Sequence, residues 1–211
     1  LLREPHPGRV TIVGGGFDAI GGQLTKGLAV YTDTGWYAWP DFPRGSNPTI
    51  KSIDVNGDSI LVFGSDLWTG LYDPREQLAL WDGTSWIAVG GGPGLTVHEA
   101  IIDFNGDIVV GGSFDNGTDW SLLKRWNGSQ WTEFLSFPNS RGEITAFERH
   151  PTADTIFVAG SFSGRVGILG DSLVTPLGDS TNPWQDFHWR GNVLSLLPTE
   201  YGIYFGMDDQ A

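Results

Sequence analysis

The sequence predicts an all-β fold, and three observations lead to that prediction. Glycine is abundant, at 31 of 211 residues, which indicates many turns and therefore many short elements. Short apolar runs recur along the chain and no segment keeps a helical period, so the runs are expected to be strands. Motifs also return in the same order at one period, which is typical of a repeat architecture.

The first motif is an apolar run that ends in glycine. It reads Ile12-Val-Gly-Gly15 at its first occurrence and Leu61-Val-Phe-Gly64 at its second. The repeat glycines, 46 to 49 residues apart, are Gly15, Gly64, Gly112, Gly160 and Gly206. Because each run is apolar throughout, we expect it to form the first strand of its repeat. Its glycine is expected where neighbouring sheets crowd together.

The second motif is a pair of aromatic residues five positions apart, with a turn between them. The pairs are Tyr31 with Trp36, Trp81 with Trp86, and Trp126 with Trp131. Turns such as Asp82-Gly83 tolerate a positive φ and suit a tight hairpin. We expect these aromatic side chains to pack between adjacent sheets. The fourth repeat lacks both aromatics and reads Leu169 to Val174 at this place.

The third motif is a turn, Asn56-Gly57 or Asn105-Gly106, that leads into the next glycine run. Four short strands in about 48 residues match one blade of an antiparallel β-propeller. We therefore expect about four blades and the first strand of a fifth, at residues 9–56, 57–105, 106–154, 155–201 and 202–211. We expect a piece of a longer propeller; the alternative is that the extra strand pairs with another copy, head-to-tail.

Composition excludes several function classes. The formal net charge of −13 argues against nucleic acid as a partner, because phosphate contacts need Lys and Arg. No apolar stretch is long enough to insert into a membrane as a helix. The absence of cysteine excludes disulfides, thiolate catalysis and Cys-ligated metals.

We expect no catalytic or metal site. The histidines share no repeat position; they are His6, His98, His150 and His188. If the propeller were an enzyme, its candidate catalytic carboxylates would be Asp66 and Asp115. The acidic turns 54–58 and 103–107 carry oxygen ligands at alternate positions, as calcium prefers, but an Asn-Gly hairpin turn accounts for them without a cation. The prediction is therefore no cofactor, with weak calcium binding as the alternative.

Two segments match the N-glycosylation acceptor pattern, Asn116-Gly-Thr118 and Asn127-Gly-Ser129. Asn127 lies in a predicted hairpin turn, where a glycan would meet no steric obstacle. The alternative interpretation is a plain turn at both places.

The segments Val110-Gly-Gly-Ser-Phe114 and Leu78-Ala-Leu-Trp-Asp-Gly-Thr-Ser-Trp86 resemble a known repeat family. It occurs in fungal cortical cell-polarity marker proteins and large secreted bacterial surface proteins, within the kelch and galactose-oxidase-like propeller group. The resemblance implies a non-enzymatic structural or adhesive module, secreted or at the cell surface. Its partner would be another protein, a glycan, or further copies of the chain. The alternative is a carbohydrate-binding, lectin-like propeller, whose candidate stacking residues in predicted loops are Trp68, Trp120, Trp184 and Trp189.

Overall fold

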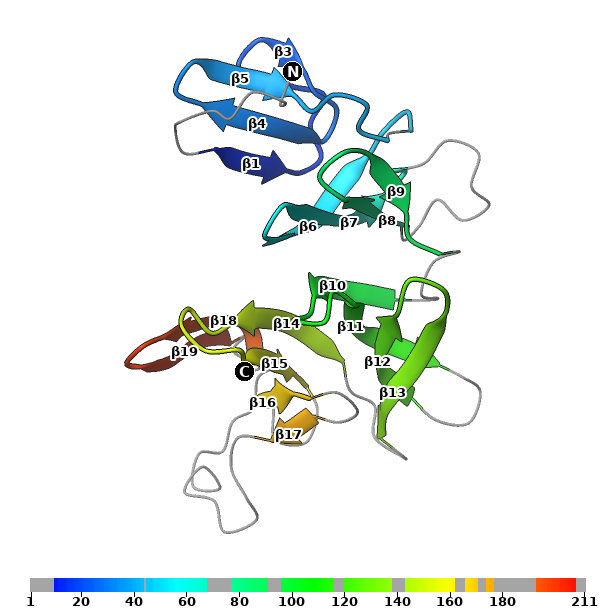
Figure 1. Cartoon of the computed structure of the whole chain (residues 1–211), viewed down its shortest axis with the longest axis vertical. Helices are drawn as coiled ribbons and strands as arrows, with labels where there is room; N and C mark the ends of the chain where they lie inside the picture. Colours follow the sequence, from blue (N-terminus) through cyan, green and yellow to red (C-terminus); the bar gives the residue numbers. More distant parts are fainter. Residues whose placement is uncertain are drawn as a thin grey trace. The chain divides into compact units, whose positions relative to one another are not determined.

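The computed structural model describes residues 10–43, 45–67, 77–90, 96–115, 120–137, 143–161, 166–170, 174–176 and 193–207. Within these ranges every regular element is a β-strand (Figure 1). The prediction of an all-β chain is therefore confirmed for the part of the chain that is described. No helix there is long and apolar enough to cross a bilayer.

The chain divides into two compact units, Leu1–Gly92 and Pro93–Ala211. The first unit begins with a three-stranded sheet of β1 (Thr11–Gly14), β4 (Leu28–Thr32) and β5 (Gly35–Ala38), and a small hairpin of β2 (Ala19–Ile20) and β3 (Gln23–Leu24). A four-stranded sheet follows, of β6 (Thr49–Asn56), β7 (Ser59–Ser65), β8 (Gln77–Trp81) and β9 (Trp86–Ala88).

The described residues of the second unit form two further four-stranded sheets and a two-stranded one. The first consists of β10 (Thr96–Ile102), β11 (Ile108–Asp115), β12 (Trp120–Trp126) and β13 (Trp131–Phe137). The next consists of β14 (Ile144–Arg149), β15 (Ile156–Gly160), β16 (Val166–Leu169) and β17 (Val174–Pro176). The last is the hairpin of β18 (Val193–Thr199) and β19 (Gly202–Met207).

Each four-stranded sheet is an antiparallel meander in chain order, but its strands are grouped one strand earlier than the sequence repeats suggested. The apolar glycine runs, β7 for example, were expected to open each blade, and they are second strands instead. The reason is the turn at Asn56-Gly57. Because the connection between β6 and β7 is only two residues long, the two strands pair with each other as a hairpin. β10 and β11 pair in the same way across the longer turn 103–107.

The repeat glycines lie opposite β-bulges in the strand before them. Gly64 pairs with Ile50 and Gly160 with Ile144, and in both cases the register shifts directly after the partner. A Cβ at Gly64 would lie well under 3.0 Å from the backbone oxygen of Thr49. Close approach within the glycine's own sheet, at a bulge, is therefore the constraint, and not the crowding between sheets that was expected.

The other repeat glycines follow this arrangement, with one exception. Gly112 pairs with Val97 and Gly206 with Ser195, again beside register shifts. Gly15 lies just after β1, where its N–H donates to the backbone oxygen of Gly27 at 3.0 Å. The glycines that face a neighbouring sheet lie one residue earlier: a Cβ at Gly14 or Gly111 would collide with the side chain of an isoleucine, Ile50 or Ile144, at or next to the start of the next sheet.

Within each unit, successive sheets bury apolar side chains between them. In the first unit Leu28 and Val30 of β4 share a cluster with Ile50 and Val62. In the second unit one cluster joins β10–β12 to β14 and β15, and another joins β14 and β15 to the β18–β19 hairpin. Second strands β7 and β15 are buried along their apolar runs, as a strand covered on both faces must be.

Candidate functional site

The paired aromatics occupy directly opposed positions on the last two strands of three of the sheets. Cα partners are Tyr31 with Trp36, Trp81 with Trp86, and Trp126 with Trp131. Their ring centroids are 4.9, 5.6 and 5.5 Å apart, all at tilted angles. Each pair thus closes its own hairpin, with the geometry that favours aromatic cross-strand contacts.

The second pair also contacts the preceding sheet's connection. Trp39 lies 5.6 Å from both Trp81 and Trp86, and Phe42 lies 5.0 Å from Trp86, all between ring centroids. Trp39 and Phe42 are buried, and sequence reasoning did not single them out. Their position in the sequence could have indicated this packing, because both aromatics closely follow the hairpin that carries the pair Tyr31 and Trp36.

Side-chain acceptors hold the turns inside these hairpins. Asp82 Oδ1 accepts hydrogen bonds from Thr84 N at 2.8 Å, Thr84 Oγ1 at 2.7 Å and Ser85 N at 2.8 Å. Asn127 Oδ1 accepts the equivalent bonds from Ser129 N at 3.1 Å, Ser129 Oγ at 2.8 Å and Gln130 N at 3.1 Å. Asp and Asn are therefore interchangeable acceptors at one position of the repeat. In the fourth sheet Leu169 pairs with Val174, so this hairpin forms without the aromatics.

These bonds lower the pKa of the Asp82 carboxyl below its ordinary value of 3.8, chiefly through the N–H of Ser85 and then through Thr84. Because the folded pKa is the lower one, the carboxylate stabilises the fold above about pH 4, and this stabilisation is lost as the pH falls through the folded pKa. We expect Asp82→Asn to keep the turn and to flatten the acid side of the stability profile. Denaturant unfolding between about pH 5 and pH 2 measures this; equal slopes in both proteins would contradict it.

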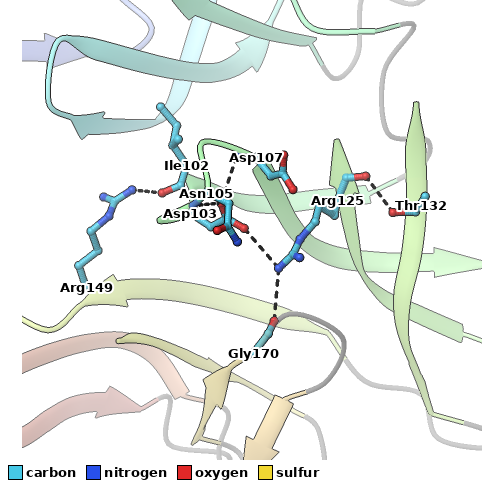
Figure 2. A network of polar contacts seen from close by, with 8 residues as sticks. All are labelled: Ile102, Asp103, Asn105, Asp107, Arg125, Thr132, Arg149 and Gly170. Atoms are coloured by element: carbon cyan, nitrogen blue, oxygen red, sulfur yellow. Dashed lines mark hydrogen bonds and ion pairs between the residues drawn. The ribbon is translucent and has the colours of Figure 1, made fainter. Parts of the chain in front are cut away.

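A part-buried polar network, centred on the buried Asp103, links two sheets of the second unit (Figure 2). Asp103 Oδ1 accepts from the N–H groups of Asn105 at 2.9 Å and Asp107 at 3.0 Å, which closes the turn. Its Oδ2 lies 3.3 Å from Nη2 of Arg125, which also donates to the carbonyl of Gly170 at 3.3 Å. Arg149, on β14, donates to the carbonyl of Ile102.

This network bears on the calcium alternative at the turn 103–107. The Asp103 carboxylate is aimed at backbone donors on one side and at a guanidinium on the other. An arginine at that position already supplies the positive charge that a cation would bring. Among the described residues no group of three or more His, Asp or Glu side chains is placed to hold a metal ion.

The described histidines have structural contacts. His98 is the extra residue of the bulge in β10, and its Nε2 lies 2.9 Å from Oε2 of Glu143, just before β14. His150 Nδ1 accepts from the N–H groups of Thr152 at 3.2 Å and Ala153 at 3.1 Å. His6 and His188 lie outside the described residues.

Asp66, the enzyme candidate, fixes a loop. Its backbone oxygen accepts from Gly45 N at 2.7 Å and its Oδ2 from Asn47 N at 2.6 Å. Its φ of 55° is a left-handed conformation that these bonds hold in place. Its proposed partner Asp115 ends β11, and the side chain of Asp115 lies outside what is described.

Other candidates of the sequence also fall outside the described part of the chain. These are Asn116 and three tryptophans that were predicted to lie in loops, Trp68, Trp184 and Trp189. Trp120 begins β12, without a described side chain.

An exposed apolar face is present on the β18–β19 hairpin. Leu197 and Tyr204 are cross-strand partners, 61% and 62% exposed, and Leu194 and Tyr201 on the same hairpin are also exposed. Along β19 the exposure alternates, with Ile203, Phe205 and Met207 packed against the second unit's core. The counterparts β7 and β15 are buried on both faces, so β19 has an apolar run with one face uncovered.

Comparisons with known proteins leave the family open. No family model and no curated protein matches the chain. The solved structure described as "Bacteroides ovatus Xyloglucan PUL GH43B" superposes over 92% of this chain at 13% sequence identity, with a TM-score of 0.37. The chain spans about half of that structure's length, 49%. A TM-score this low establishes neither fold nor activity.

Proposed function

We propose that this chain is a non-enzymatic β-propeller module of a secreted or cell-surface protein, with a structural or adhesive role. In this role one of its sheets packs against a sheet of a second copy, so that copies associate head-to-tail. The observation that carries the proposal is the exposed pair Leu197 and Tyr204 on β18–β19. In the second unit, each earlier sheet packs its corresponding face against the sheet that follows it in the chain.

The first sheet supplies the complementary face. Its Tyr31 is 45% exposed. The counterpart in the next sheet, Trp81, is only partly exposed because Trp39 of the preceding connection packs on it. The first sheet and the β18–β19 hairpin therefore each have an exposed apolar face, marked by Tyr31 on one and by Leu197 and Tyr204 on the other. A contact between two different faces is heterologous, and such a contact propagates head-to-tail.

Charged and polar groups in the described residues favour this contact role over catalysis. The carboxylates of Asp66, Asp82 and Asp103 accept hydrogen bonds that hold loops and turns. Copies of a chain with a net charge of −13 repel one another, so an apolar contact between them should strengthen as salt screens that repulsion.

Sedimentation of the whole chain over a range of concentrations tests the proposal. We expect association that strengthens with salt, and a dissociation constant raised at least about tenfold by Leu197→Ser with Tyr204→Ser, or by Tyr31→Ser, because each removes a buried apolar anchor. Ile87→Ser, at a residue exposed on β9, is the matched control and should change nothing.

A mixing experiment separates a heterologous contact from a symmetric one. The Tyr31→Ser chain keeps an intact β18–β19 face, and the Leu197→Ser, Tyr204→Ser chain keeps an intact first sheet. Mixed together, they should form pairs of one copy each and nothing larger. A chain that stays monomeric at every concentration and salt level would overturn the proposed contact.

A further inference from the structure

We infer that Asn127 is the acceptor of an N-linked glycan. Asn127 is exposed at the tip of the β12–β13 hairpin, in the triplet Asn127-Gly128-Ser129. Gly128 has a φ of 91°, and a Cβ built there would meet nothing within 4 Å. The turn therefore faces open space, where an oligosaccharide displaces no neighbouring side chain.

The orientation of the amide is set by its hydrogen bonds. Two backbone N–H groups, of Ser129 and Gln130, donate to one side-chain atom of Asn127, so that atom must be the oxygen. The amide nitrogen then points away from the turn. The Ser129 hydroxyl donates to the same oxygen at 2.8 Å. The hydroxyl that the acceptor pattern requires is therefore already hydrogen-bonded to the side-chain amide of Asn127.

The modification is a group transfer from a polyprenyl-diphosphate-linked oligosaccharide, catalysed by a membrane oligosaccharyltransferase. Asn127 Nδ2 forms a bond to the anomeric carbon of the sugar, and the bond from that carbon to the diphosphate oxygen breaks. The nitrogen gives up one of its two protons to a base of the transferase, and the lipid diphosphate leaves. Nδ2 is the atom that the turn does not use: the three hydrogen bonds go to Oδ1.

The repeat provides its own control, because Asp82 occupies the same turn position with the same three bonds. Asn127→Asp should therefore remove the acceptor nitrogen and keep the hairpin. The converse change, Asp82→Asn, completes an acceptor triplet with Gly83 and Thr84 on the second sheet. If the turn geometry is what suits the transferase, the glycan should follow the amide from one hairpin to the other.

The test is peptide mapping of the full chain secreted from eukaryotic cells behind a leader peptide. Enzymatic deglycosylation in heavy-oxygen water marks each occupied asparagine and separates position 127 from position 116. We expect position 127 to be marked in the parent chain, unmarked in Asn127→Asp and Ser129→Ala, and position 82 to be marked in Asp82→Asn. Unchanged thermal unfolding of the deglycosylated proteins shows that the variants fold.

Either of two results would overturn the inference: position 127 unmodified in the secreted parent chain, or position 82 unmodified in Asp82→Asn. Both readouts are independent of self-association. A failed glycan and a failed head-to-tail contact are therefore distinguishable.

Discussion

Replacing Gly64 with alanine is expected to destabilise the first unit by about 3 kcal/mol, at the upper end of the cost of forcing an extra carbon into a packed strand. The added Cβ would lie well under 3.0 Å from the carbonyl oxygen of Thr49 and close to Cα of Ile50. Both are backbone atoms held by the β6–β7 pairing, so neither can move as a flexible side chain would. Denaturant unfolding of the parent and Gly64→Ala chains measures the loss.

The matched control for Gly64 is Gly16, in the same unit. A Cβ at Gly16 would meet only the side chain of Thr49, at 3.4 Å, which is ordinary contact. Gly16→Ala should therefore change the free energy of unfolding by no more than about 0.5 kcal/mol. Equal effects of the two substitutions would show that lost glycine flexibility, and not the bulge, sets the cost.

Replacing Arg125 with methionine is expected to destabilise the second unit by about 3 kcal/mol, because it leaves the Asp103 carboxylate buried without its counter-charge. The Asp103 and Arg125 side chains are only 6% and 14% exposed, and their charged atoms lie 3.3 Å apart. Loss of the bond from Arg125 to the Gly170 carbonyl adds to the cost, since it links β12 to the end of β16. Thermal and denaturant unfolding give the value.

Two further variants show that charge burial is the cause. Asp103→Asn in the Arg125→Met background keeps the Oδ1 that accepts from Asn105 and Asp107, and removes the stranded charge. It should recover about 1 kcal/mol or more, since a neutral amide costs less to bury than a carboxylate. Lys124→Met, which breaks the more exposed 3.8 Å pair with Glu133, should cost under about 0.5 kcal/mol. A small loss in Arg125→Met, comparable to that of Lys124→Met, would contradict the account.

The sequence predicted the strands and the aromatic hairpins because both depend on local chemistry. A turn such as Asp82-Gly83 is decided by residues within four positions, and the aromatic pair five positions apart then faces itself across the hairpin. The Asn-Gly turns were recognised for the same reason. The prediction that a new blade begins after each Asn-Gly turn was wrong. A turn of this kind joins two strands of one sheet and does not separate two repeats.

The candidate sites were only partly predictable. Asn127 and its hydroxyl partner are two residues apart, so a three-residue pattern identifies them. The partner of Asp103 lies 22 residues away on another strand, and nothing in the spacing indicates that Arg125 would face it. From the sequence, the acidic turn was therefore weighed only as a hairpin turn or a weak calcium site, and the ion pair was not foreseen.

The sequence by itself determined the repeat, its period and the β-hairpins, since these follow from turn chemistry and from short apolar runs that return at a fixed spacing. Only the tertiary structure decided why the repeat glycines are needed, which polar groups are buried together, and which apolar faces are left uncovered. Bulges, buried ion pairs and sheet packing depend on strands far apart in the chain. The exposure of Tyr204 is of this kind, because the apolar run of β19 differs little from the runs of β7 and β15, which are buried.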